Sequence, residues 1–213
     1  MEILQHISEQ LQKGEDGDVR RLTQSAVDQE ITAQKILRDG LIAGMTVVGE
    51  RFRDHEIFLP DVLLAAKAMT GGLEVLQPHM IGGRVPSIGK VVLGTVKGDL
   101  HDIGKNLVGI MLQGAGYEVI DLGHDVAPER FLEAAREQGA AVIGMSALLT
   151  TTMPAMRRVV DLLAEADLKG DVRTIIGGAP VSQDFADEIG ADAYAYDAAH
   201  AVEQVKALTR RTP

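Results

Sequence analysis

From residue 90 onward, short apolar runs alternate five times with amphipathic segments. The expected strands are 90–96, 118–122, 141–145, 173–176 and 192–195, and the expected helices run from residue 104, at 128–138, 154–166 and 182–189, and up to residue 208. Strands and helices that alternate in this way form a parallel sheet with helices on both faces. We therefore expect an α/β fold with a flavodoxin-like (Rossmann-like), five-stranded parallel sheet in the order 2-1-3-4-5.

The first eighty residues show helical periodicity and no convincing strand. Apolar residues recur at a spacing of three and four within 3–11, 19–26, 32–52 and 60–76, and the third of these segments is interrupted near Asp39 and Gly40. Asp16 or Asp18 is the expected N-cap of the second helix. Four such helices joined by short loops predict an antiparallel four-helix bundle.

A segment with three glycines and one proline, 81–89, separates the two patterns. This composition is typical of a linker between domains. We therefore expect a helical-bundle domain at 1–82 and an α/β domain at 90–213.

An unusual loop follows the first expected strand and reads Gly98-Asp99-Leu100-His101-Asp102-Ile103-Gly104-Lys105-Asn106. Open α/β sheets bind ligands at the carboxyl ends of their strands. Because Asp99 and His101 are two residues apart, they project to the same side of an extended segment. The carboxylate can then hold one imidazole nitrogen and leave the other free as a metal ligand. Taken alone, Asp-x-His more often marks an ordinary hydrogen-bonded histidine.

Two further loops are expected at the same edge, because strands one, three and four are neighbours in the predicted order. The loop after the third strand contains Ser146, Thr150, Thr151 and Thr152, and one of their hydroxyls is expected to cap the helix that Pro154 opens. The loop after the fourth strand begins with Gly177-Gly178, which lets a backbone or a flat ligand approach closely. Together, the three loops predict a ligand site.

Composition limits the chemistry of that site. The chain has no cysteine, so it forms no disulfide, thiolate nucleophile, Fe–S cluster or Cys-ligated zinc site. A formal net charge of −10 and 3% aromatic residues argue against nucleic acid and anionic membrane as partners. The absence of a secretion signal and of a transmembrane-length apolar run leads us to expect a cytoplasmic protein.

The residues Asp99-x-His101-x-x-Gly104, Ser146-x-Leu148 and Gly177-Gly178, in this order, resemble the fingerprint of the cobalamin-binding domain in the methionine synthase and methylmalonyl-CoA mutase superfamily. The helical part, with Phe58-Leu59-Pro60-Asp61-Val62, resembles the bundle that caps the corrinoid in methionine synthase. Stand-alone proteins of this two-domain form are similar to the corrinoid subunits of methanol, methylamine and glycine-betaine methyltransferase systems. The resemblance extends over nearly the whole chain.

This resemblance implies cobalamin or a related corrinoid, in its methylated form methylcobalamin, as the cofactor. His101 would be the lower axial ligand of cobalt, Asp99 would hold the other imidazole nitrogen, and Thr152 would end the relay where methionine synthase has a serine. These three residues would form the catalytic set. Further cofactor contacts are implied for Gly98, Asp102, Ile103, Gly104, Asn106, Ser146, Leu148, Thr150, Gly177, Gly178 and Phe58.

The resemblance also implies a methyl carrier, a component of a methyltransferase system rather than a complete enzyme. It would shuttle a methyl group on cobalt between a substrate:corrinoid methyltransferase and a second methyltransferase that serves tetrahydrofolate or coenzyme M. A reductive activase would be a further partner, and neither nucleic acid nor membrane would be. For cobalt to meet other proteins, the helical cap would move aside about residues 81–89.

Three alternatives come from other classes of protein: a metal-dependent phosphoesterase, a phosphorylated receiver domain and a non-catalytic cobalamin sensor. Phosphoesterases also begin with strand-Gly-Asp-x-His, but they need later Gly-Asp-x-x-Asp-Arg-Gly and Gly-Asn-His blocks, which this chain lacks. A sensor would normally carry a basic DNA-binding module, and the first eighty residues contain none. A receiver domain shares the strand order but requires an aspartate where this chain has Met145-Ser146.

Overall fold

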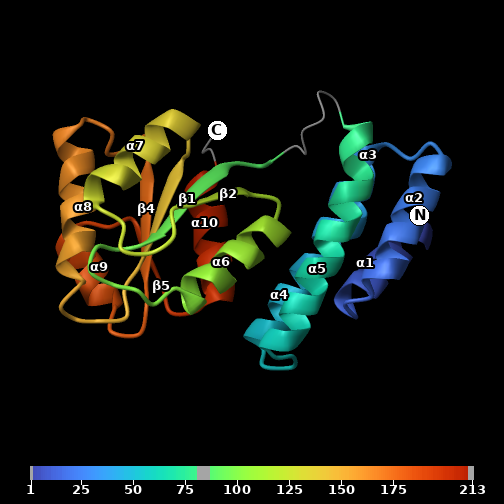
Figure 1. The fold of residues 1–213 in the computed structure, drawn as a ribbon, viewed down its shortest axis with the longest axis horizontal. Helices are drawn as coiled ribbons and strands as arrows, with labels where there is room; N and C mark the ends of the chain where they lie inside the picture. The colour runs from blue at the N-terminus through green and yellow to red at the C-terminus, as the bar shows by residue number, and fades with distance from the viewer. Residues whose placement is uncertain (1, 81–86, 211–213) are drawn as a thin grey trace. The chain divides into compact units, whose positions relative to one another are not determined.

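The computed structural model describes residues 2–80 and 87–210, and the chain forms two compact units (Figure 1). Helices up to residue 79 build the first unit, and the sheet with its helices builds the second. The predicted linker falls largely outside the described residues, because 81–86 are not among them. Within the described ranges, no helix is long and apolar enough to cross a membrane.

The first unit is a helical bundle. Its elements are α1 (Glu2–Gln12), α2 (Asp16–Asp28), α3 (Ala33–Ile36), η1 (Leu37–Ile42), α4 (Ala43–Arg53), α5 (Leu59–Leu76) and η2 (Gln77–His79). Apolar side chains at the predicted spacing, among them Ile7, Leu11, Val19, Leu41 and Val62, are fully buried. The interruption expected near residue 39 is a π-helical stretch, η1, that continues directly into α4.

The predicted cap of the second helix was wrong. Glu15 occupies the N-cap of α2 and its side chain makes no cap hydrogen bond, whereas Asp16 and Asp18 lie in the first turn. Negative charge in this turn favours the helix through the dipole. Asp16 also accepts a hydrogen bond from Arg20 at 2.9 Å, so its carboxylate is already engaged on the helix surface.

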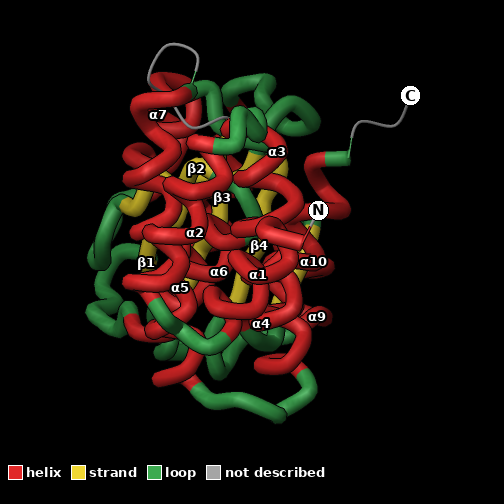
Figure 2. Tube along the Cα trace, turned by 90° about the vertical axis from the view of Figure 1, so that its right-hand side faces the viewer, coloured by secondary structure: helices red, strands yellow, loops and turns green. Residues whose placement is uncertain are grey.

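The second unit contains a five-stranded parallel sheet in the order β2-β1-β3-β4-β5, as predicted. Its strands are β1 (Lys90–Thr95), β2 (Glu118–Asp121), β3 (Val142–Ser146), β4 (Arg173–Gly177) and β5 (Ala193–Ala195). Strands are drawn in yellow in Figure 2, where β1, β2, β3 and β4 are labelled. Thr95 pairs with Ser146, and Ser146 pairs with Gly177, so β1, β3 and β4 end side by side.

Helices cover both faces of the sheet (Figure 1). They are α6 (Ile103–Gly114), α7 (Pro128–Gln138), α8 (Pro154–Glu165), α9 (Gln183–Ile189) and α10 (Ala198–Thr209). In Figure 1, α7, α8 and α9 lie on one side of the strands, and α6 and α10 lie on the other. Phe131 of α7 and Met156 of α8 are fully buried in one apolar cluster with Ile143 of β3 and Ile176 of β4. This core holds the carboxyl ends of the strands in place.

Candidate functional site

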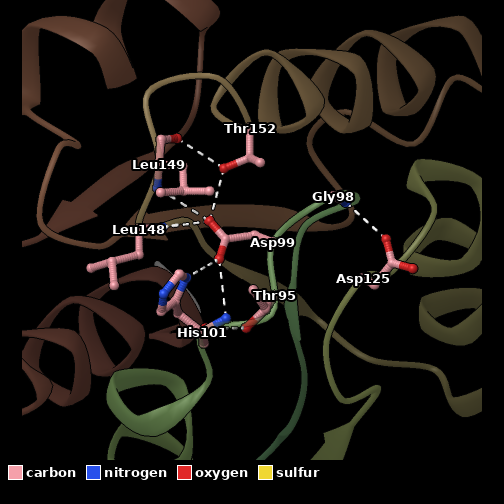
Figure 3. A network of polar contacts seen from close by, with 8 residues as sticks. All are labelled: Thr95, Gly98, Asp99, His101, Asp125, Leu148, Leu149 and Thr152. Carbon is pink, nitrogen blue, oxygen red and sulfur yellow. Dashed lines mark hydrogen bonds and ion pairs between the residues drawn. The ribbon is translucent and has the colours of Figure 1, made fainter.

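The predicted loop after β1 has the expected contact between Asp99 and His101 (Figure 3). Asp99 Oδ1 lies 2.8 Å from His101 Nδ1 and accepts the His101 backbone N–H at 3.1 Å. Gly98, just before, has a φ of +84°, a backbone conformation that glycine adopts without steric cost. The turn at Gly98 therefore brings the carboxylate onto the imidazole two residues later.

The second oxygen of Asp99 binds the loop after β3. Asp99 Oδ2 accepts the backbone N–H groups of Leu148 at 2.7 Å and Leu149 at 3.2 Å, and the hydroxyl of Thr152 at 2.8 Å. Asp99 is fully buried. Burial alone would raise its pKa, but hydrogen bonds from Leu148, His101 and Thr152 outweigh burial and hold the pKa well below its usual value. Asp99 is therefore an ionised carboxylate at neutral pH.

The imidazole of His101 has one nitrogen engaged and one free. Its side chain is 54% exposed although Asp99 beside it is buried. In Figure 3, Nε2 points away from Asp99, and no described residue makes a hydrogen bond to it. Exposed apolar side chains lie on the loops that carry and flank His101, namely Leu100, Ile103, Leu148 and Leu149. A free nitrogen on an apolar surface suits a metal held within a large, flat ligand.

The prediction that one of the hydroxyl groups after β3 caps α8 was wrong. Met153 is the N-cap of this helix and provides no side-chain cap. The Thr152 hydroxyl lies 2.8 Å from Asp99 Oδ2 and 2.8 Å from the carbonyl oxygen of Leu149. It is therefore hydrogen-bonded within the site and does not cap the helix. Thr152 is buried, Thr150 is exposed, and Ser146 is the half-buried last residue of β3.

The predicted glycines differ in what surrounds them. A Cβ at Gly178, where φ is +124°, would lie 1.9 Å from the carbonyl oxygen of Ala147, and one at Gly177 would lie 2.9 Å from the carbonyl oxygen of Ala195. Protein backbone alone therefore explains both residues. A Cβ at Gly104 would meet nothing within 4 Å, so open space lies beside the start of α6.

The other predicted contact residues are not equally available. Ile103 is exposed, whereas Asp102 is half-buried and its carbonyl oxygen accepts the N–H of Asn106 at 2.8 Å. The side-chain oxygen of Asn106 is engaged by Lys105 Nζ at 2.6 Å. Phe58 lies in the first unit as the exposed N-cap of α5, where its backbone N–H donates to Asp61 at 2.9 Å. A cofactor contact by Phe58 stays a prediction.

The sequence analysis missed the loop after β2, which also borders the histidine loop. Asp125 Oδ1 accepts the N–H of Gly98 at 2.8 Å (Figure 3). Lys105 is buried at the start of α6, and its ammonium lies 2.6 Å from both carboxylate oxygens of Asp121 at the end of β2. The signal was available, because the predicted order places β2 directly beside β1.

His200 is half-buried. It stacks on Tyr196 with ring centroids 4.2 Å apart, and Nε2 lies 2.8 Å from Gln204 Nε2. Nδ1 is buried and has no hydrogen-bond partner among the described residues. Tyr196 directly follows β5, so this ring pair lies at the same edge of the sheet as His101.

The phosphoesterase alternative requires a cluster of metal ligands. In the part of the chain that the structure describes, no three His, Asp or Glu side chains are grouped so that they could hold a metal ion. His101 instead offers a single nitrogen, which suits a metal whose other ligands come with a cofactor.

Comparisons with known proteins agree with this geometry. Two models of a B12 binding domain match the chain, one over residues 3–77 and the other over residues 89–206. A corrinoid protein of Desulfitobacterium hafniense is 44% identical over 206 residues, which cover 95% of each chain. Dimethylamine corrinoid protein 1 of Methanosarcina acetivorans is 49% identical over 180 residues, 84% of each chain.

Solved structures give the same result. A chain in the methanol:cobalamin methyltransferase complex from Methanosarcina barkeri matches with a TM-score of 0.90 and 34% identity over 99% of this chain and 81% of that one. A cobalamin-binding protein from Desulfitobacterium hafniense matches with a TM-score of 0.80 and 31% identity over 96% of this chain and 98% of that one. The chain therefore belongs to the B12-binding corrinoid proteins of methyltransferase systems, and its cofactor is a corrinoid with cobalt.

Proposed function

We propose that this protein carries methyl groups on the cobalt of its corrinoid and that His101 is the lower axial ligand of that cobalt. The observation that carries the proposal is the pairing of His101 Nδ1 with the buried, ionised Asp99 while Nε2 is left free. Metal-binding histidines typically hold a carboxylate with their second nitrogen. We further propose that residues 90–213 form the corrinoid-binding domain, because His101 and the groups that hold it all lie there.

The fit of a corrinoid to these residues rests on three features of the loops. His101 offers a nitrogen ligand, the exposed leucines and Ile103 offer apolar surface, and Gly104 faces open space. A corrinoid supplies a cobalt centre that accepts a methyl group from one molecule and gives it to another. The task of the protein is to hold that cofactor and to control the nitrogen beneath it.

The hydrogen bonds of Asp99 determine which imidazole nitrogen carries the proton. An ionised carboxylate only accepts hydrogen bonds, so His101 must present Nδ1–H to it. Nε2 then keeps its lone pair and points outward as a ligand. Leu148, Leu149 and Thr152 donate to the other carboxylate oxygen and hold Asp99 ionised.

The partners we propose are a substrate:corrinoid methyltransferase, a second methyltransferase and a reductive activase. Support for the first comes from the solved complex of a methanol:cobalamin methyltransferase, which contains a chain that matches 99% of the present chain. Relatives named for dimethylamine and trimethylamine support a methylated amine as the original methyl donor, and the solved complex supports methanol.

The test replaces His101 and compares it with another exposed histidine. Wild-type protein, His101→Ala and the control His6→Ala, which lies in α1, are loaded with hydroxocobalamin and desalted. We expect wild type and His6→Ala to retain the cofactor with the same visible spectrum. His101→Ala should shift that spectrum and bind at least about tenfold more weakly, because the cobalt loses its protein ligand. Equal spectra and affinities in all three proteins would refute the role of His101.

A further inference from the structure

The segment 123–126, which follows β2, is attached to the end of β1. Thr95 donates its N–H to the carbonyl oxygen of Gly123 at 2.9 Å and accepts the N–H of Val126 at 3.0 Å. Val96 and Val126 form a parallel bridge just beyond. The fully buried Thr95 also donates its hydroxyl to the carbonyl oxygen of His101 at 3.0 Å. The segment therefore lies on one side of the histidine loop, and the loop after β3 lies on the other.

Within this segment, Asp125 forms hydrogen bonds with Gly98 and Asp99, whose backbone positions the Asp99 carboxylate. Its Oδ1 accepts the N–H of Gly98 at 2.8 Å, and its own N–H donates to the carbonyl oxygen of Asp99 at 3.0 Å. Asp125 has a φ of +56°, a left-handed conformation that aspartate adopts more readily than most residues. In this conformation Asp125 contacts Gly98 through its side chain and Asp99 through its own N–H at the same time.

We propose that Asp125 is a positioning residue for His101, and that it acts by fixing the backbone of Gly98 and Asp99; the inference rests on the proposed role of His101. Without these contacts the backbone at Gly98 could rotate, because glycine has wide conformational freedom. Its surroundings restrict it little, since the nearest atom to a Cβ built on Gly98 would be Thr152 Cγ2 at 3.5 Å. Rotation at Gly98 would swing the Asp99 carboxylate away from Leu148 and the imidazole. Asp125 prevents this rotation from the side opposite to Leu148.

The ion pair of Asp125 with Lys97 is not what fixes the backbone of Gly98 and Asp99. Lys97 Nζ lies 3.1 Å from the carboxylate, and both side chains are exposed, so the pair contributes little. Asparagine at position 125 would lose the ion pair but could still accept the Gly98 N–H and adopt positive φ. Alanine would lose both contacts of the side chain. These two substitutions separate positioning from charge.

The experiment compares Asp125→Ala and Asp125→Asn with the control Asp167→Ala. Asp167 is an exposed aspartate with a φ of +54° in the turn after α8, so its replacement imposes the same backbone strain away from the site. Amide hydrogen exchange is measured by NMR on the full chain without corrinoid. In Asp125→Ala we expect the Leu148 and Leu149 amides, which donate to Asp99, to exchange about tenfold faster, with amides of α10 unchanged. Asp125→Asn and Asp167→Ala should match wild type at these amides.

A titration with hydroxocobalamin then tests the link to the cofactor. Asp125→Ala should bind about tenfold more weakly and show a smaller share of the histidine-bound spectrum, and Asp125→Asn should restore both. The proposal is overturned if the Leu148 and Leu149 amides do not change in Asp125→Ala, if Asp125→Asn fails to restore them, or if corrinoid affinity stays at the wild-type value. The exchange result does not depend on cobalt ligation, which His101→Ala tests separately, so a failure of the Asp125 proposal can be told apart from a failure of the His101 proposal.

Discussion

At the scale of single residues, the site depends on the buried carboxylate of Asp99. Its two oxygens accept hydrogen bonds from three backbone amides, from the Thr152 hydroxyl and from the His101 ring. A buried charge without such partners costs several kcal/mol, whereas a fully paired one is tolerated. The donors are therefore as much a part of the site as the carboxylate itself.

Replacing Asp99 by asparagine should both destabilise the fold and weaken the cofactor site. The side-chain NH₂ must face either the amides of Leu148 and Leu149 or the His101 side, so donors meet donors. We expect a loss of about 1–3 kcal/mol in unfolding free energy and about 10- to 100-fold in corrinoid affinity. Urea unfolding followed by the tyrosine signal measures the first, because all three tyrosines lie in the second unit. Wild-type values in both measurements would contradict this account of Asp99.

The Asp99–His101 contact could be predicted from sequence because it depends on local spacing. Two residues in an extended segment share a side, whatever the rest of the chain does. The donors Leu148 and Leu149 could not be predicted in this way, because a backbone N–H is the same in every residue. Their role follows only from the close approach of two loops about fifty positions apart along the chain.

At the scale of elements, we expect opposite effects on stability when two glycines of the predicted site are replaced by alanine. Gly178→Ala should cost about 3 kcal/mol or more, because the new Cβ would lie 1.9 Å from the Ala147 carbonyl oxygen at a φ of +124°. Gly104→Ala should leave stability unchanged or raise it by about 0.5–1 kcal/mol, because its Cβ would meet nothing within 4 Å at the start of α6.

The two alanine variants should also separate stability from cofactor binding. Gly104→Ala is expected to weaken corrinoid binding while the protein stays stable, since the open space at Gly104 is where we place the cofactor. Urea unfolding and a hydroxocobalamin titration on each variant provide the comparison. Equal stability of the two variants would show that the contact of Gly178 with Ala147 does not constrain the sheet.

Tyr117 links the start of β2 to the end of α10, and its ionisation should make stability depend on pH. Its hydroxyl lies 2.7 Å from Thr209 Oγ1, and burial raises the pKa of the phenol. The unfolded chain therefore loses this proton first, so the stability from Tyr117 is complete below pH about 10 and declines as the pH rises toward the folded pKa. An alkaline titration of tyrosinate absorbance should contain a late component that Tyr117→Phe removes. A titration unchanged by that substitution would contradict the burial of the phenol.

Most elements of the second unit could be placed from sequence because local signals mark their ends. The bounds of α7, for example, agree with the prediction, since Pro128 opens the helix and Gly139 ends it in the left-handed conformation. The expected cap of α8 failed for a reason that no local pattern contains, because the Thr152 hydroxyl is held by Asp99.

At the scale of the whole molecule, the strand order follows from a general rule of parallel sheets and was predicted correctly. That order also places the loops after β2 and β3 on either side of the His101 loop, yet only the loops after β1, β3 and β4 were recognised in the sequence. The loop after β2, with Asp125, was missed because a single aspartate beside a glycine is common in turns. Topology had to be combined with side-chain contacts to assign it a role.

The measurement that tests the central claim most directly is electron paramagnetic resonance of the corrinoid-loaded protein with its cobalt reduced to the paramagnetic Co(II) state. The spectrum is recorded with natural-abundance histidine and with ¹⁵N-labelled histidine. We predict that the nitrogen splitting changes from the pattern of ¹⁴N to that of ¹⁵N, and that His101→Ala abolishes the splitting from histidine. A spectrum that is identical with both isotopes would show that no histidine binds the cobalt and would contradict the proposed role of His101.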